Sequence, residues 1–144
     1  MNDNNVISLP VAADLSADAN LHKLVYMSAT GINLVTSILG ATATSKYVGT
    51  LSRGNHKPDG ISSAVGMSAG VQLATGNVHL VQTDATAILV GSELELSATD
   101  GVVALSGTTA SAGASKVGIA LEANGSTACQ IRAIIWPCPN LGGV

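Results

Sequence analysis

The chain has 144 residues, of which 47% are hydrophobic and 10% are charged, and its net charge is −3. This length suits a single folded domain, and the hydrophobic content excludes a disordered chain. Six Lys and Arg residues spread along the sequence exclude a basic surface for nucleic acid. Charge this sparse cannot coat a monomer, so we expect self-association to bury part of the surface.

The first twenty residues differ from the rest of the chain. Several Asn and Asp residues surround the pair Leu9-Pro10, and these residue types oppose regular structure. We expect residues 1–20 to form an extended arm that gives nothing to the core, and residues 21–144 to form a β-domain. The start is polar and lacks the basic and apolar stretches of a signal peptide, so we expect none. No apolar run approaches the roughly 18 residues of a membrane helix.

Beyond this arm, short apolar runs alternate with Gly, Asn, Asp and Ser. Their spacing predicts an all-β fold, a small sandwich or barrel-like domain of about ten short strands. The predicted strands are residues 21–27, 32–36, 46–51, 71–74, 78–82, 87–90, 93–97, 102–106, 117–121 and 129–136. Residues 37–45 and 107–115 contain small polar side chains and predict long loops. Residues 61–70 fit either a strand or a loop.

The segment from Glu93 to Gly101 carries a clear alternation. In Glu93-Leu94-Glu95-Leu96 the pattern predicts acids facing water and leucines facing the core. The pair Asp100-Gly101 then predicts a hairpin turn, because its central residues accept positive φ.

A short internal echo links two predicted strands. Lys46-Tyr47-Val48-Gly49-Thr50-Leu51 resembles Lys116-Val117-Gly118-Ile119-Ala120-Leu121. Glycine inside a strand marks a bulge or a close backbone contact. We therefore expect two similar bends in one domain.

Candidate catalytic and metal-binding residues are few. Gly66-Met67-Ser68-Ala69-Gly70 matches a nucleophile pattern around Ser68, but a strand follows it instead of the helix that such an elbow needs. His22, His56 and His79 lack a second ligand at metal spacing, and we expect His79 on the solvent face of its strand. Glu93 and Glu95 share a strand face and predict a solvated pair more than a catalytic one. We expect no catalytic, metal or cofactor site and no enzyme.

Three other features of the sequence have structural interpretations. Arg53, His56 and Lys57 lie in a segment rich in Pro and Gly that predicts an exposed loop. Cys129 and Cys138 flank a predicted strand end, so we expect free thiols, unless the chain doubles back. Trp136 could stack a sugar or base, but we favour sealing a core or gripping a neighbouring subunit.

The second half resembles the small decoration (cement) proteins of tailed-bacteriophage capsids. The motifs that carry the resemblance are Gly91-Ser92-Glu93-Leu94-Glu95-Leu96, Asp100-Gly101-Val102-Val103, Val117-Gly118-Ile119-Ala120-Leu121-Glu122-Ala123 and Ile131-Arg132-Ala133-Ile134. They cover roughly a third of the chain. Residues 1–20 and the segment from Arg53 to Gly60 are outside this pattern.

The resemblance implies an all-β protein on the outside of an assembled phage head. Its partners would be the major capsid protein and further copies of itself, most often as a homotrimer, and it would bind neither nucleic acid nor membrane. It would be made in the host cytoplasm and end on the virion exterior. The alternative is a phage fibre or adhesion module that binds a surface glycan through exposed loops. An esterase-like enzyme using Ser68 is the weakest reading.

Overall fold

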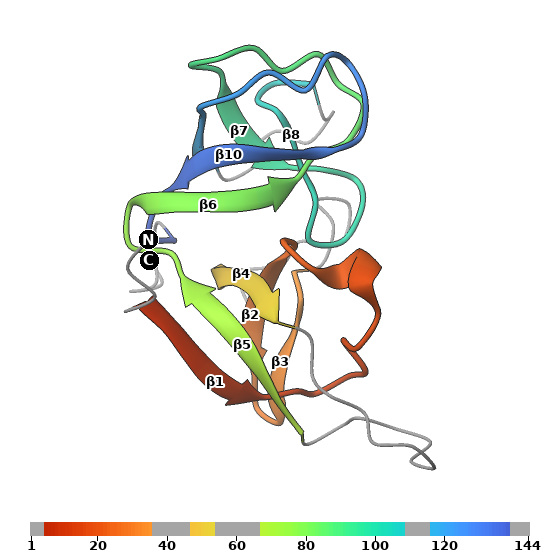
Figure 1. Ribbon diagram of the computed structural model, residues 1–144, viewed down its shortest axis with the longest axis vertical. Coiled ribbons are helices and arrows are strands. Elements are labelled where there is room, and N and C mark those ends of the chain that lie inside the picture. Colours follow the sequence, from red (N-terminus) through yellow and green to blue (C-terminus); the bar gives the residue numbers. More distant parts are fainter. Residues whose placement is uncertain (1–4, 36–46, 54–66, 109–115, 139–144) are drawn as a thin grey trace.

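The computed structural model describes residues 5–35, 47–53, 67–108 and 116–138. These residues form ten strands in two five-stranded antiparallel sheets that are not closed into a barrel (Figure 1). Sheet A contains β1 (Val6–Pro10), β2 (Leu24–Ser28), β3 (Gly31–Leu34), β4 (Tyr47–Arg53) and β5 (Ser68–Leu73). Sheet B contains β6 (Asn77–Gln82), β7 (Glu93–Leu96), β8 (Val103–Leu105), β9 (Lys116–Ala120) and β10 (Gln130–Ile135). The all-β prediction is confirmed, and the described residues add one 3₁₀ turn, η2 (Asp18–Asn20).

The two sheets repeat one topology. Sheet A has the strand order β1-β5-β4-β2-β3, and sheet B has the order β6-β10-β9-β7-β8. Adding five to each strand number of sheet A gives the order of sheet B. The chain therefore contains the same five-stranded unit twice, one after the other.

The repeat extends to the pairing of individual residues. Gly49 pairs with Val25, and Gly118 pairs with Leu94, and a register shift follows each pair in β2 and β7. A Cβ at either glycine would lie 2.0 Å from a carbonyl oxygen of the neighbouring strand. The bends expected from the sequence echo thus occur at equivalent positions, and both require glycine.

A second set of equivalent contacts lies at the ends of β1 and β6. Val11 forms an isolated parallel bridge with Ile32, and Thr83 forms the same bridge with Val103. Two backbone hydrogen bonds repeat as well, from Ala12 N to Ile32 O and from Asp84 N to Val103 O. Because these bridges join distant strands in the same way, the repeat is one of tertiary structure.

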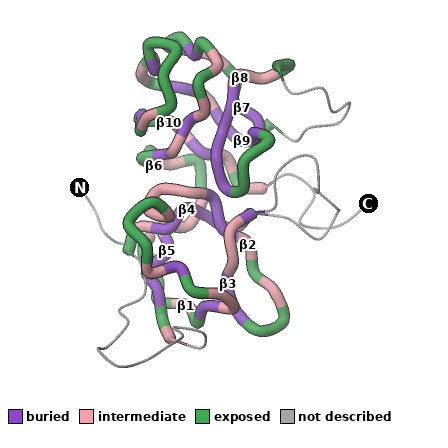
Figure 2. The backbone as a smooth tube through the Cα atoms, turned by 90° about the vertical axis from the view of Figure 1, so that its right-hand side faces the viewer, coloured by how far each residue is buried: buried purple, intermediate pink, exposed green. Residues whose placement is uncertain are grey.

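Two clusters of buried side chains stabilise the fold. One comes from sheet A and its connections and includes Val11, Leu15, Val25, Ile32, Leu51, Ala69 and Val71. The other lies mainly on sheet B but also includes Leu24, Val35 and Tyr47 from the first half. Figure 2 shows buried backbone running through both sheets and across the region between them. The second core therefore exists only when both units are folded and packed together.

The N-terminal segment differs from its prediction. Residues 6–10 form β1, which pairs with β5 from Val6↔Gln72 to Pro10↔Ser68. Val11 and Leu15 are fully buried, although we expected this segment to give nothing to the core. An edge strand tolerates Pro10 because one row of its backbone groups needs no partner, which is why proline did not exclude a strand here.

Two other expectations are wrong and one is confirmed. Residues 87–90 form no strand, and their apolar side chains lie in the connection from β6 to β7. Glu95 is buried instead of facing water, because the register shift after Leu94 changes its surroundings. Gly101 lies in the β7–β8 turn with φ +72°, as expected from the Asp-Gly pair. The predicted loops at 37–45 and 107–115 lie largely outside the described residues.

Candidate functional site

A polar network joins the two sheets around His79 of β6. Its Nδ1 lies 2.8 Å from the hydroxyl of Thr50 on β4, and its Nε2 lies 2.8 Å from Asn77 Oδ1. Asn77 Oδ1 also accepts a hydrogen bond from the Thr75 N–H. Since an amide oxygen only accepts, Nε2 carries the ring proton, and Nδ1 accepts the hydroxyl proton of Thr50.

Burial determines the protonation of this network. Burial lowers the pKa of His79 from 6.5 to about 4, and a hydrogen bond to the Leu73 backbone opposes this effect. His79 is therefore neutral near pH 7.

A second hydrogen bond also joins the two units: the Tyr47 hydroxyl donates to the carbonyl of Trp136 at 2.8 Å. Burial raises the pKa of this tyrosine, and Cys138 adds to the rise.

Hydroxyl, imidazole and amide stand here in the order of a nucleophile, a base and an orienting group. Thr50 and His79 are each only 1% exposed, however. A substrate could not reach the hydroxyl without separating the sheets. The network thus holds sheet A against sheet B, with every described polar atom of the imidazole satisfied.

The outer face of sheet B is unusually apolar. Directly paired residues share a face of a sheet, and the rows Val78–Ile134–Ile119 and Leu80–Arg132 belong to one face. Leu121 follows β9 and bonds to the Arg132 carbonyl through its own N–H. We call the face formed by Val78, Leu80, Ile119, Leu121 and Ile134 the apolar face.

The connection from β6 to β7 enlarges this surface. Leu89 and Val90 are 68% and 69% exposed, and the next residue, Gly91, donates to the Ala120 carbonyl beside Leu121. Figure 1 shows this connection at the end of the molecule away from sheet A. Leu89 and Val90 therefore add exposed apolar side chains next to the end of β9.

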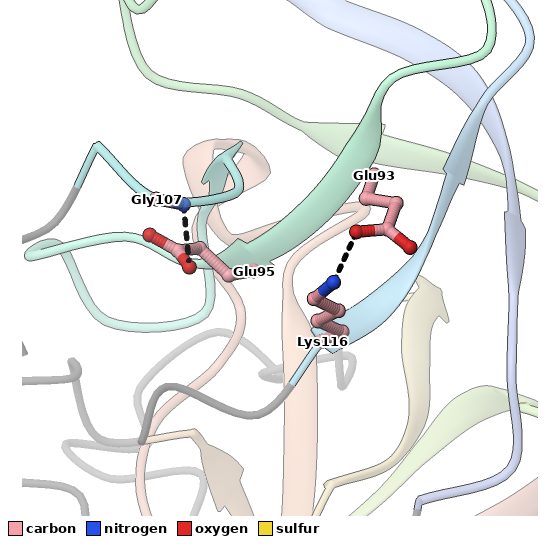
Figure 3. A network of polar contacts seen from close by, with 4 residues as sticks. All are labelled: Glu93, Glu95, Gly107 and Lys116. Atoms are coloured by element: carbon pink, nitrogen blue, oxygen red, sulfur yellow. Dashed lines mark hydrogen bonds and ion pairs between the residues drawn. The ribbon is translucent and has the colours of Figure 1, made fainter. Parts of the chain in front are cut away.

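Two ion pairs lie on this face of sheet B, since Glu93 pairs directly with Ile119 and Arg132 pairs directly with Leu80. Lys116 pairs with Glu93 across β9 and β7, and Arg132 pairs with Glu122 at 2.8 Å. Glu95 points elsewhere and accepts a hydrogen bond from the Gly107 N–H at 3.0 Å (Figure 3). Glu93 and Glu95 therefore have separate partners and do not act as a pair. Within each ion pair the two charges neutralise each other, and Arg132 lies between Leu80 on β6 and Leu121 after β9.

The other sequence candidates are not brought together. Ser68 is exposed at the start of β5 opposite Pro10, inside a continuous strand pairing instead of a strand-to-helix turn. His22 lies in the turn before β2 with φ +64°, where burial lowers its pKa. Cys129 and Cys138 are not joined by a disulfide, as expected. Arg53 ends β4, whereas His56 and Lys57 lie outside the described residues.

His79 corrects our sequence interpretation. We expected it on the solvent face, but it is buried, while its apolar neighbours Val78 and Leu80 are 48% and 42% exposed. The sequence carried no signal for this choice, since an apolar-polar-apolar run fits either orientation. Only the packing of Thr50 against this strand decides which side is buried. Trp136 is half-buried directly after β10, and its carbonyl accepts the Tyr47 hydroxyl. The seal or subunit contact expected of its side chain stays a prediction.

The composition and secondary structure of the described residues bear on metal binding and membrane insertion. The described part of the chain contains no group of three or more His, Cys, Asp or Glu side chains that could hold a metal ion. It also contains no helix long and apolar enough to cross a membrane. Comparison of the chain with models of known protein families and with curated proteins finds no match.

Proposed function

We propose that this chain is a structural virion protein that binds the outside of a phage capsid and stabilises the shell, as a decoration or cement protein. The observation that carries the proposal is the apolar face of sheet B with the exposed Leu89 and Val90 beside it. A protein with so few charges and so much exposed apolar surface functions in an assembly. From its resemblance to decoration proteins we infer that this assembly is a phage capsid.

The chemistry of the described residues supports a role without catalysis. The arrangement of nucleophile, base and orienting group at Thr50, His79 and Asn77 is buried between the sheets. Its hydrogen bonds stabilise the packing of the two units. We therefore propose no enzyme activity, no cofactor and no metal.

Nothing observed favours the glycan-binding alternative. A glycan-binding module of this kind would need aromatic residues on exposed loops, and the chain has three aromatic residues, all in the described part. Tyr47 is buried, and Tyr26 and Trp136 are half-buried. None of them forms an exposed platform on a loop.

The same surface supports the partners that we propose. We propose the major capsid protein and further copies of this chain, as a homotrimer, with neither nucleic acid nor membrane involved. The net charge of the chain is negative, and Lys116 and Arg132 are already paired with glutamates of the same chain. We therefore expect the contacts with partners to use apolar surface and backbone pairing instead of charge. The protein would be made in the host cytoplasm and function on the capsid exterior.

The test adds purified protein to bare heads of the phage that encodes it. We expect saturable binding to the outside of the shell, seen by electron microscopy, and a rise in the temperature at which the heads release DNA. A matched sample uses heat-unfolded protein at the same concentration. Absence of binding at micromolar protein, with the fold intact by circular dichroism, would contradict the proposal.

A further inference from the structure

The internal repeat allows the two units to be compared position by position. In sheet A the row Leu24–Thr50–Gln72 is the counterpart of the row Glu93–Ile119–Ile134 in sheet B, because the cross-strand pairs correspond one to one. The first row is covered by the second unit, while the second row has no described segment of the chain over it. The outer face of sheet A is thus covered by the second unit, whereas the equivalent face of sheet B is left uncovered by the described residues.

The covered row is held by specific contacts. Leu24 N donates to the Gly101 carbonyl of the β7–β8 turn. Thr50 bonds to His79, and Gln72 Nε2 donates to the Val78 carbonyl. Sheet B therefore places the β6 edge of its own unit on the outer face of the preceding unit.

At two of the three positions the chemistry of the rows is the reverse of what water exposure would favour, whereas the third pair, buried Leu24 and exposed Glu93, follows it. The covered row carries Thr50 and Gln72, whereas the uncovered row carries Ile119 and Ile134 at the same positions. A face left to solvent would be the more polar of the two. The isoleucines indicate that this face is also covered in the working state of the protein.

The counterpart of the covering strand is exposed as well. Ile7 on β1 corresponds to His79 on β6, since Ile7 pairs with Val71 and His79 pairs with Ala133 at matching positions. His79 is buried against Thr50, but Ile7 and its neighbour Val6 are each 39% exposed. In the repeat, Ile119 stands at the position of Thr50 and Ile7 stands at the position of His79. Thr50 and His79 contact each other within the chain, whereas Ile119 and Ile7 lie on different sheets and do not.

We propose that the apolar face of sheet B binds the β1 edge of a second copy of this chain, head to tail, with Ile7 of one copy packed against Ile119 of the next. The contact repeats the packing of sheet B on sheet A that exists within the chain. Such an interface is heterologous and forms a ring when its rotation closes. Closure after three copies gives the homotrimer proposed above, so the inference rests on that self-association and holds with or without a capsid.

The test blocks each half of the contact separately. The variants are Ile7→Lys and Ile119→Lys, and the control is Met27→Lys, a substitution of a 44% exposed apolar side chain on β2. We expect each blocked variant to be monomeric by sedimentation at micromolar concentration, and the control to match the unmodified chain. Circular dichroism and the urea midpoint check that all three variants fold.

Mixing the blocked variants gives the sharpest result. The Ile7→Lys protein keeps a complete apolar face, and the Ile119→Lys protein keeps a complete β1 edge, so an equimolar mixture should form a one-to-one dimer and stop there. Retention of the native oligomer by either variant alone overturns the head-to-tail contact but leaves self-association standing. A monomeric unmodified chain that still binds shells overturns the inference and assigns the apolar face to the capsid, leaving shell binding intact.

Discussion

The hydroxyl of Thr50 and the Nδ1 atom of His79 lie 2.8 Å apart where the outer side of sheet A meets the edge of sheet B. The two residues belong to different units of the repeat, so their hydrogen bond forms only when the units pack together. It also stabilises the neutral form of the His79 imidazole. Stability, pH and the packing of the two sheets are therefore linked through one side chain.

Acid should weaken the fold through His79. Its pKa is about 4 in the folded protein and 6.5 when solvated. Between these pH values the unfolded chain binds a proton at His79 and the folded protein does not. The contribution of His79 to the free energy of unfolding is therefore complete above pH 6.5 and is lost as pH falls toward 4. We expect the free energy of unfolding to fall by about 2 kcal/mol between pH 7.5 and 5.

Urea unfolding across this pH range measures the effect. His79→Gln removes the titrating ring, so its unfolding free energy should vary less with pH, although it is lower at pH 7.5. Burial also lowers the pKa of His22, which leaves a smaller residual dependence of the same sign. An unchanged pH dependence in His79→Gln would contradict the assignment.

The glycines inside β4 and β9 should be intolerant of any side chain. A Cβ at Gly49 or Gly118 would meet a backbone carbonyl at 2.0 Å, and strand pairing fixes that carbonyl. We expect Gly49→Ala and Gly118→Ala to destabilise the protein by about 3 kcal/mol or more, or to prevent folding.

Gly107→Ala is the matched control. Gly107 has φ +85° but open space around it, so its substitution should cost about 1–2 kcal/mol from backbone strain alone. Thermal unfolding compares the three variants. Equal effects at all three glycines would show that the close backbone approach does not matter.

Removal of residues 1–18 should unfold sheet A. The deletion removes β1 together with Val11 and Leu15, which are buried in the core of sheet A. We expect loss of the β signal in circular dichroism and binding of a hydrophobic dye.

A point substitution tests the same claim more gently. Leu15→Ala should lower the free energy of unfolding by about 2–5 kcal/mol because it leaves a cavity. Met27→Ala, at an exposed position, should change it by less than about 0.5 kcal/mol. A stable, folded deletion protein would restore the view of this segment as a separate arm.

Attachment to the shell should depend little on salt. Apolar burial is nearly indifferent to moderate ionic strength, whereas charge pairs weaken as screening shortens. We expect equal occupancy of bare heads at about 50 mM and 500 mM salt, conditions that span this screening range. If occupancy collapses at the higher concentration, the contact is electrostatic, and the segment with Arg53, His56 and Lys57 becomes its first candidate.

The sequence by itself determined the fold class and most of the strands. Period-two patterns predicted nine of the ten strands at least in part, since alternation reports which faces are buried without needing the partner strand. The echo of Val48-Gly49 and Val117-Gly118 pointed to two equivalent bends, because glycine in a strand has few other causes. The absence of a disulfide between Cys129 and Cys138 and the Asp-Gly turn could also be predicted from spacing alone.

Only the tertiary structure decided which face of a strand meets solvent and which strands pair. Val78-His79-Leu80 alternates equally well in both directions, and the packing of Thr50 against β6 buries the histidine and exposes the two apolar side chains. Strand β1 escaped prediction because its polar surroundings and Pro10 are tolerated only at a sheet edge. The duplication itself lies in pairing between residues far apart in the chain, which local patterns do not encode.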